Sequence, residues 1–335
     1  MRSAIFVGAG RPLAIEHVAM PRPGPHQALI RVERCGICGS DLHMTSGGPF
    51  DMPHGTALGH EYAGEVVEVG AGDARLKVGH RVTALPMSGC GECPACLADT
   101  PLHCASMRSM AGGYSEYTLI DQRKAIRLPD SLDYDDGALI EPLASGLRGV
   151  CKLGDVSGKR VAVIGAGAIG SAAIFWARRR GAGPITAIAR STQNQALSQT
   201  LGADSFLTIA DGLGLRLADA LGGPPDIVIE AAGAVGAIQQ AVDLVRVGGT
   251  ILSLGGCALP DTIMPMLAMV KEVELRFSVA YGLCDFREAV ESLEAGHVSP
   301  RAMIGETVTL DELPERFDSM RRGSHPAKVM VRPHA

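Results

Sequence analysis

The first part of the chain is a series of short apolar runs separated by glycine and proline. Residues 28–33, 64–70 and 81–85 alternate apolar and polar positions and are bounded by turn-forming residues. A period of two with turns at these spacings is typical of β-strands with one buried face. From Ala4 to about Leu128 the pattern therefore predicts an all-β, barrel-like domain.

The pattern changes near Lys159, where strand-like runs begin to alternate with helical ones. The apolar runs lie at residues 160–164, 184–189, 225–230 and 249–254. Strands that alternate with helices form a parallel, doubly wound α/β sheet. Residues 272–278 are a further strand-like segment, which we expect at the edge of that sheet. After another helix and loop, residues 328–331 are the last predicted strand.

Composition narrows the class of protein. The chain has 335 residues, enough for two domains, and its net charge of -5 comes without a basic stripe, so nucleic acid is not an expected partner. The longest uncharged stretch, residues 161–177, is too short and glycine-rich for a membrane span. The N-terminus lacks the apolar core of a signal peptide, and we expect a cytoplasmic protein.

Four cysteines lie close together with the spacing C-x2-C-x2-C-x7-C: Cys90, Cys93, Cys96 and Cys104. Thiolates this close on one loop can surround a single Zn²⁺ tetrahedrally and leave no open position, which is the pattern of a structural site. Two disulfide bonds are the alternative, and the absence of a secretory signal argues against them. Three other cysteines, Cys151, Cys257 and Cys284, stand alone and are predicted to be small core residues.

A second group of potential metal ligands precedes the four-cysteine loop. Cys38 lies in the segment Cys-Gly-Ile-Cys-Gly-Ser-Asp, and His60 and Glu61 follow in Gly-His-Glu-Tyr. One thiolate, one imidazole and a carboxylate with a position left open is the pattern of catalytic zinc. The sequence thus predicts two zinc ions per chain.

A glycine-rich turn follows the strand at residues 160–164 and opens a predicted helix: Gly165, Gly167, Ala168, Ile169 and Gly170. In that context G-x-G-x-x-G is a dinucleotide fingerprint. The first glycine makes the turn, the second lets the backbone approach the pyrophosphate, and the third lets helix and strand pack closely. The free N–H groups of the helix N-terminus then face the phosphates.

The end of the next strand indicates which nicotinamide cofactor is used. An NAD site usually ends this strand with an acid that accepts from the ribose 2′-hydroxyl, but here the residues are Ala189, Arg190 and Ser191. The missing acid removes repulsion of a 2′-phosphate, and the guanidinium offers it a planar charged fork. We therefore predict NADP; a solvated surface arginine is the alternative.

Over nearly its whole length the chain resembles the zinc-dependent medium-chain alcohol and polyol dehydrogenases, which include sorbitol and threonine dehydrogenases. The motifs that carry the resemblance are the Cys38 segment, the Gly59-His60-Glu61 segment, the four-cysteine loop, Glu141-Pro142 and the fingerprint at residues 165–170. One departure is Asp73, in a predicted turn where a hydrophobic residue is common. The resemblance implies a GroES-like catalytic domain in residues 1–146, a Rossmann domain in 147–282, and a return to the catalytic domain in 283–335.

The resemblance also implies roles for individual residues. Cys38 and His60 would bind the catalytic zinc, with either Glu61 or Glu141 as the third ligand; relatives of both kinds exist, so the choice stays open. Asp41 would orient His60. Two further side chains, Ser40 and His43, resemble a relay that carries the proton of the alcohol away.

One sequence feature bears on the substrate. Polyol-type relatives carry an Arg-Tyr pair where this chain has Ala280-Tyr281, and this favours a simple or aryl alcohol as substrate. The predicted activity is hydride transfer between an alcohol and NADP, by a homodimer or homotetramer. A non-catalytic NADP-binding protein, an L-threonine or sugar-alcohol dehydrogenase, and a zinc-free quinone or enoyl reductase are the alternatives; the last lacks both cysteine-containing groups.

Overall fold

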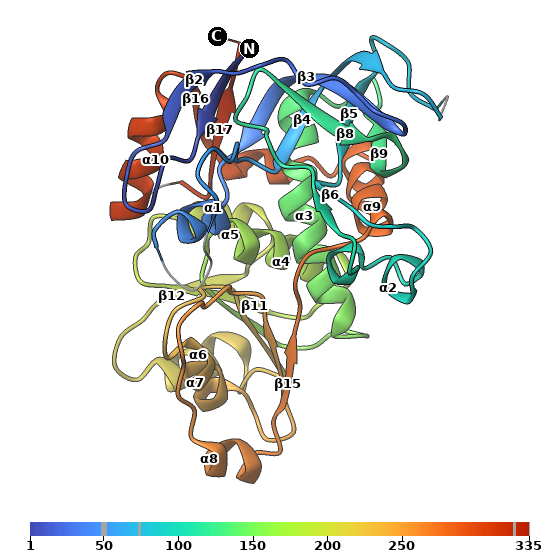
Figure 1. Ribbon diagram of the computed structural model, residues 1–335. Coiled ribbons are helices and arrows are strands. Elements are labelled where there is room, and N and C mark those ends of the chain that lie inside the picture. The colour runs from blue at the N-terminus through green and yellow to red at the C-terminus, as the bar shows by residue number, and fades with distance from the viewer. Residues whose placement is uncertain (48–51, 73–74, 324–325, 335) are drawn as a thin grey trace. The chain divides into compact units, whose positions relative to one another are not determined.

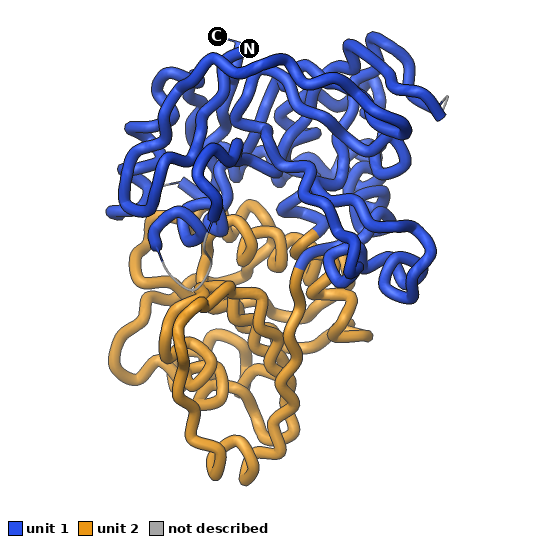
Figure 2. Tube along the Cα trace, viewed as in Figure 1, with its two compact units in different colours: residues 1–144, 280–335 blue, residues 145–279 orange. Residues whose placement is uncertain are grey.

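A computed structural model describes residues 1–47, 52–72, 75–323 and 326–334. The chain forms two compact units, residues 1–144 with 280–335 (unit 1) and residues 145–279 (unit 2), which Figure 2 distinguishes by colour. These boundaries lie within three residues of the positions 146 and 282 expected from the sequence. The predicted turn at Asp73 lies outside the described residues.

Unit 1 is built on a seven-stranded sheet, as far as the chain is described, in the order β16-β17-β3-β4-β5-β9 with β8 paired to β3. Its strands are β3 (Gln27–Gly36), β4 (Glu61–Val69), β5 (Arg81–Ala84), β8 (Tyr117–Asp121), β9 (Ala125–Arg127), β16 (Ile304–Thr309) and β17 (Lys328–Arg332). Only β16 and β17 pair in parallel. Short ribbons are added by β1 (Arg2–Ile5) with β2 (Ala14–His17) and by β6 (Met87–Ser88) with β7 (Arg108–Ser109).

Unit 1 also contains helices: two short ones and two 3-10 turns lie within residues 4–128, for which only strands were predicted, and the others lie outside that range. The helices are α1 (Gly39–Met44), α2 (Pro94–Leu97), the first part of α3 (Tyr134–Lys152), α9 (Leu283–Glu294) and α10 (Leu313–Arg322), with 3-10 turns η1 (Pro101–His103), η2 (Gln122–Lys124) and η3 (Ser299–Met303). The first two are one-turn or slightly longer helices, too short to show a helical period. They still matter, because α1 and α2 carry potential metal ligands or adjoin them.

Unit 2 contains a parallel sheet, in its described residues, in the order β12-β11-β10-β13-β14-β15 (Figure 1). The strands are β10 (Val161–Ile164), β11 (Ile185–Ala189), β12 (Ser205–Thr208), β13 (Ile227–Glu230), β14 (Thr250–Ser253) and β15 (Glu274–Phe277). The helices between them are α4 (Ala168–Arg179), α5 (Gln195–Thr200), α6 (Leu213–Leu221), α7 (Ala237–Leu244) and α8 (Pro265–Val270). The doubly wound prediction is confirmed, including β15 at the edge.

The order of this sheet reverses between β10 and β13, and such a switch point is where open α/β sheets bind ligands. The apolar faces of both units are well buried: Ile30, Val66 and Phe317 are fully buried in unit 1, as are Ala162 and Val228 in unit 2. Among the described residues, none of the helices is both long and apolar enough to cross a membrane.

Candidate metal centres and nucleotide site

Sheet register brings the mixed group of ligands together. In the antiparallel pair β3–β4, Gly36 lies opposite Glu61, so Cys38, just past the end of β3, comes next to His60, just before β4. A side chain at position 36 would overlap the carboxylate of Glu61, which explains the glycine. The sheet thus joins two motifs that lie far apart in the sequence.

Ligand atoms of Cys38, His60 and Glu61 all lie within 4.8 Å of one another. Tetrahedral zinc with bonds of 2.0–2.3 Å separates its ligands by about 3.3–3.8 Å, so a small inward movement would close this group around one ion. The set fits Zn²⁺ in chemistry as well, since it combines thiolate, imidazole and carboxylate donors.

Asp41 lies beside the imidazole of His60. The carboxylate is buried, its Oδ1 lies 3.2 Å from His60 Nδ1, and its Oδ2 accepts a 2.6 Å hydrogen bond from the hydroxyl of Tyr114. This leaves Nε2 of His60 on the side of Cys38 and Ser40. Burial lowers the pKa of His60, but Asp41 and the thiolate of Cys38 raise it more, and the net pKa is well above the ordinary value. The same negative charges would attract a metal cation.

Glu61 is held by a buried lysine that the sequence analysis did not identify. Lys328 Nζ donates to both carboxylate oxygens of Glu61 at 2.6 Å and to the carbonyl of Ile37 at 3.2 Å. Both charged side chains are 1% exposed. Burial lowers the pKa of Lys328, and Glu61 raises it more, so the pKa lies above its usual value. The spacing of Glu61 allows metal binding, but its charge is already compensated.

Glu141 is the second candidate carboxylate. It lies within α3, does not belong to the group of ligand atoms within 4.8 Å, and is 7% exposed. Burial raises its pKa to about 7, partly offset by His60. Its carboxylate accepts a hydrogen bond from Tyr281, which is 4% exposed. A buried carboxyl group with a raised pKa favours a nearby cation, because a positive charge would stabilise its ionised form.

The two relay candidates differ in position. The hydroxyl of Ser40 lies 3.2 Å from Cys38 Sγ and 3.5 Å from His60 Nε2, so it belongs to the site. His43 is an exposed residue in the last turn of α1. Of the two candidates, Ser40 is therefore the one with hydrogen-bond contacts to the potential metal ligands.

The four cysteines of the loop also come together. The sulfurs of Cys90, Cys93, Cys96 and Cys104 all lie within 4.8 Å of one another. Cys90 and Cys96 are 4.0 Å apart, close to the roughly 3.8 Å between thiolates on tetrahedral zinc. Backbone N–H groups lower the pKa of Cys90 to about 6. The backbone of Gly91 lowers the pKa of Cys96, but burial and three neighbouring thiols raise it to about 11. Four thiolates can coexist here only with a cation, and Zn²⁺ fits.

The fingerprint has the backbone expected of a phosphate site. Gly165 has φ +94°, and a side chain at Gly170 would overlap the carbonyl of Gly165. Helix α4 begins at Ala168, directly after the turn. Strand β11 ends at Ala189, and Arg190 and Ser191 follow it as exposed residues.

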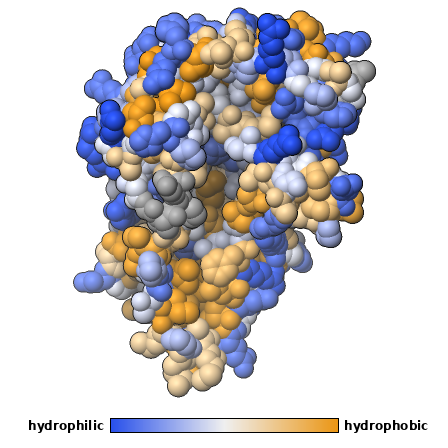
Figure 3. All heavy atoms as spheres, viewed as in Figure 1, coloured by the Kyte–Doolittle hydropathy of each residue, from blue (hydrophilic) through white to orange (hydrophobic). Residues whose placement is uncertain are grey.

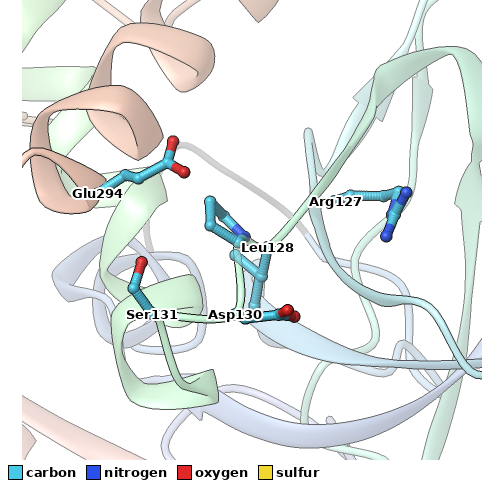
Figure 4. A pocket seen from close by; sticks show the side chains of 6 residues that line it. Arg127, Leu128, Asp130, Ser131 and Glu294 are labelled. Atoms are coloured by element: carbon cyan, nitrogen blue, oxygen red, sulfur yellow. The ribbon is translucent and has the colours of Figure 1, made fainter.

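A surface hollow of about 490 Å³ elsewhere in unit 1 contains none of these residues. Figure 4 shows that the charged ends of Arg127, Asp130 and Glu294 lie apart and do not converge on one point. The hollow therefore lacks the convergent polar groups of a ligand site.

Sequence reasoning missed Lys328 and Tyr114 as members of the mixed site. Lys328 begins a short apolar strand, and nothing in its neighbourhood marks it as the partner of Glu61. Tyr114 follows two glycines, an unusual setting for a large side chain, but its contact with Asp41 depends on the fold. Tyr281 was noted in the sequence without its bond to Glu141.

Comparison with known proteins agrees with this geometry. The family model "Alcohol dehydrogenase GroES-like domain" matches residues 24–130, and "Zinc-binding dehydrogenase" matches residues 168–295. The (R,R)-butanediol dehydrogenase of Bacillus subtilis is 33% identical and covers 96% of this chain and 97% of its own length. The sorbitol dehydrogenase of Gallus gallus is 30% identical, covering 98% and 96%.

Solved structures give the same result. A structure from Sinorhizobium meliloti described as a zinc-binding dehydrogenase bound to NADP has a TM-score of 0.88 at 31% identity and covers 99% of both chains. The similarity spans both units, and the relatives are catalytic proteins, which supports an enzyme over a non-catalytic nucleotide-binding protein. The chain belongs to the zinc-dependent medium-chain alcohol and polyol dehydrogenases, and it is an oxidoreductase that acts on CH–OH groups.

Proposed function

We propose that this dehydrogenase uses NADP(H), binds catalytic zinc through Cys38, His60 and Glu141, and keeps a second zinc in the four-cysteine loop. The observation that carries the choice of Glu141 is the double hydrogen bond from Lys328 to Glu61. Because Lys328 already neutralises Glu61, a metal ion gains more by pairing with the uncompensated carboxyl of Glu141. The distances alone favour Glu61. The buried ion pair outweighs these distances, because separating Glu61 from Lys328 would leave two buried charges without partners.

Zinc bound at this site would polarise the oxygen of an alcohol or carbonyl substrate. The chain's own groups then hold and move the proton. Ser40 lies within reach of the metal side of Cys38 and His60, and its hydroxyl can accept the proton of the alcohol and pass it to solvent. Asp41 keeps Nδ1 of His60 engaged, which leaves Nε2 for the metal.

NADP preference is supported by the residues at the end of β11. Position 189 carries no acid to repel a 2′-phosphate, and Arg190 is exposed directly after it. Other arginines of unit 2 are otherwise engaged: Arg178 donates to the carbonyl of Gly202 and pairs with Asp204. A bidentate guanidinium–phosphate contact contributes about 1.5–3 kcal/mol.

Removing Arg190 tests this preference. Arg190→Ala should weaken use of NADP⁺ by about tenfold or more and leave NAD⁺ nearly unchanged. Ala189→Asp should shift the preference towards NAD⁺, and Ser191→Ala serves as a milder neighbouring variant. Steady-state kinetics with both nucleotides provide the measurement. Equal use of NAD⁺ and NADP⁺ by the unaltered protein would contradict the proposal.

The substrate class we propose is a small alcohol with a neighbouring hydroxyl group. Butanediol and sorbitol, which name two of the relatives, share this feature. A screen should compare 2,3-butanediol, sorbitol and xylitol with 1-butanol, benzyl alcohol and L-threonine, following NADPH formation. Activity confined to simple or aryl alcohols would instead support the expectation drawn from the missing arginine before Tyr281.

We also propose that the protein is a homo-oligomer joined along β15. This strand lies at the edge of its sheet, and Met266, Met269, Val270 and Phe277 nearby are exposed. Figure 3 shows apolar residues gathered on one face of unit 2. An edge strand with exposed apolar side chains beside it favours pairing with a second copy. Light scattering should show a dimer or tetramer that Phe277→Glu weakens; a monomer would contradict the proposal.

The reduced cysteines that both metal sites need are consistent with a cytoplasmic location.

A further inference from the structure

Helix α9 begins without a capping side chain of its own. Its N-cap residue is Gly282, which has no side-chain oxygen to accept from the first turn. Asp285 reaches back and accepts from the N–H of Gly282 at 2.7 Å, but this does not satisfy the N–H groups inside the first turn.

An aspartate from the four-cysteine loop supplies the missing cap. Asp99 lies between Cys96 and Cys104, and its Oδ2 accepts a 2.8 Å hydrogen bond from the N–H of Cys284, the second residue of α9. That bond is the one an N-cap side chain normally makes. A side chain at Gly282 would overlap the Asp99 carboxylate, so the glycine leaves room for a cap from outside the helix.

The loop is shaped to present this carboxylate. Asp99 has φ +53°, in the left-handed region that costs energy for a residue other than glycine. Its N–H donates to the carbonyl of Cys96 at 3.1 Å, which ties its backbone to one of the four cysteines. Burial raises the pKa of Asp99, but hydrogen bonds from Cys284 and Leu283 lower it by more, so the net pKa is below its usual value. The ionised carboxylate is therefore the form that α9 stabilises.

The start of α9 in turn positions a contact of the mixed site. Tyr281 directly precedes Gly282, packs against Phe286 of the first turn at 5.0 Å between rings, and donates to Glu141. Ala280 before it has φ +54°, so the segment enters the helix through a tight bend. A shift of the first turn would move the hydroxyl of Tyr281 away from Glu141.

We infer that Asp99 is a positioning residue: the four-cysteine loop holds it against the N-terminus of α9, and this contact keeps Tyr281 hydrogen-bonded to Glu141. The loop would then support the mixed site as well as itself. The step that involves Glu141 rests on the proposed function, whereas the capping of α9 does not.

The capping step is tested by the reactivity of Cys284. This thiol is exposed and its N–H and side chain bond to Asp99, so loss of the cap should raise its rate of alkylation by N-ethylmaleimide, followed by peptide mass spectrometry. In zinc-loaded protein, Asp99→Ala should raise the rate about fivefold. Asp99→Asn keeps an accepting oxygen and should raise it less. Glu92→Ala removes an exposed acid of the same loop and should have no effect.

Metal in the loop should act through the same contact. Cys93→Ser, which disrupts the thiolate set, should raise Cys284 alkylation to the level of Asp99→Ala even though Asp99 is present. An unchanged rate in Asp99→Ala would overturn the capping role. An unchanged rate in Cys93→Ser would overturn the dependence on the loop.

The link to Tyr281 is tested by a double-variant cycle with the alcohol that the substrate screen identifies. Asp99→Ala should lower kcat about fivefold with little change in the KM for NADP⁺. In a Tyr281→Phe background, Asp99→Ala should lower kcat almost no further, because the hydrogen bond from Tyr281 to Glu141 is already absent. Additive effects would overturn the link. If unaltered protein oxidises no alcohol, the proposed function fails, while the alkylation experiment still decides the capping role.

Discussion

The two metal-ligand groups of unit 1 are built in different ways. The four-cysteine loop takes every ligand from residues 90–104, and three of its four cysteines are exposed or half-buried. The mixed group takes Cys38 from the end of β3 and His60 and Glu61 from the start of β4, and it lies among buried charged side chains. Local spacing is therefore enough to form the first site, whereas the second depends on sheet register and on partners from distant parts of the chain.

This difference predicts opposite consequences for the loss of one cysteine. If Cys38 binds catalytic zinc as proposed, Cys38→Ser should lower kcat by at least about a thousandfold, because it removes a ligand of the metal that would polarise the substrate. Cys93→Ser should mainly lower the unfolding temperature, because a closed four-thiolate site supplies folding energy. Activity assays, zinc analysis and thermal unfolding of both variants measure this, with about two zinc ions per chain expected in the unaltered protein.

The opposite result for either variant would contradict this comparison of the two groups. If Cys38→Ser remained active, or if Cys93→Ser lost activity without any loss of stability, the two groups would not have the separate roles that their ligands indicate. Cys151→Ser is a control, since this exposed cysteine belongs to neither group.

The sequence alone predicts the four-cysteine site more fully than the mixed site, because only the first takes all its ligands from one short segment. The spacing of Cys90, Cys93, Cys96 and Cys104 needed no knowledge of the fold. Cys38 and His60 were predicted as ligands from their local motifs. Which carboxylate joins them could not be decided from the sequence, because the pairing of Glu61 with Lys328, 267 residues away, is visible only in the fold.

The fold shows the same limit. Strands β10, β11, β13 and β14 were predicted closely because each is a mostly buried apolar run, but β12, whose residues are all half-buried, was missed. The burial of isolated cysteines could not be predicted from residue type alone. Cys151 and Cys284 were expected in the core and are exposed, so that prediction was wrong.

The buried ion pair of the mixed site gives the next largest effect. Lys328→Met leaves the carboxylate of Glu61 buried without a counter-charge and should lower the free energy of unfolding by about 3–5 kcal/mol. Combining it with Glu61→Gln should restore much of that loss. Chemical denaturation of the single and double variants measures both.

The four-cysteine loop supplies the matched control for this experiment. Glu92 is an exposed acid there, and Glu92→Gln should change stability by less than about 0.5 kcal/mol. A small loss in Lys328→Met, or a double variant no better than the single one, would show that the pair does not hold Glu61 in place.

Glu141 should make the zinc-free protein sensitive to pH. Burial raises its pKa from 4.5 to about 7 in the folded state, so the folded protein holds this proton more tightly than the unfolded chain does. The resulting stability is present below pH 4.5 and is lost as the pH rises to about 7. The urea midpoint of the zinc-free protein, measured relative to that of zinc-free Glu141→Gln, should therefore fall as the pH rises across this range.

Zinc should reverse that trend if Glu141 is a ligand. A bound cation stabilises the ionised carboxylate, so the loaded protein should gain stability relative to Glu141→Gln as the pH rises through the same range. The same pH dependence with and without zinc would favour Glu61 as the third ligand.

The smallest predicted effect concerns the support of His60. Tyr114→Phe keeps the ring, which packs against Phe317 at 6.3 Å, but removes the hydroxyl that donates to Asp41. Because Asp41 orients the ligand His60, zinc at the mixed site should bind about tenfold more weakly. Chelator competition measures the affinities of the two sites separately, and the four-cysteine loop should be unaffected.

Tyr62→Phe is the matched control, because Tyr62 is another buried tyrosine of unit 1 whose hydroxyl donates to a backbone carbonyl, that of Met110, at 2.9 Å. Tyr114→Phe loses the bond to the Asp41 carboxylate and a longer 3.3 Å bond to the carbonyl of Gly36, so it should lose about 1.5–3 kcal/mol of stability, against about 1 kcal/mol for Tyr62→Phe. Only Tyr114→Phe should weaken zinc binding at the mixed site. If the two variants weaken zinc binding equally, the effect comes from packing of unit 1 and not from the hydroxyl of Tyr114. If neither variant weakens it, Asp41 holds His60 without help from Tyr114. The mixed site would then depend on fewer distant partners than its hydrogen bonds indicate.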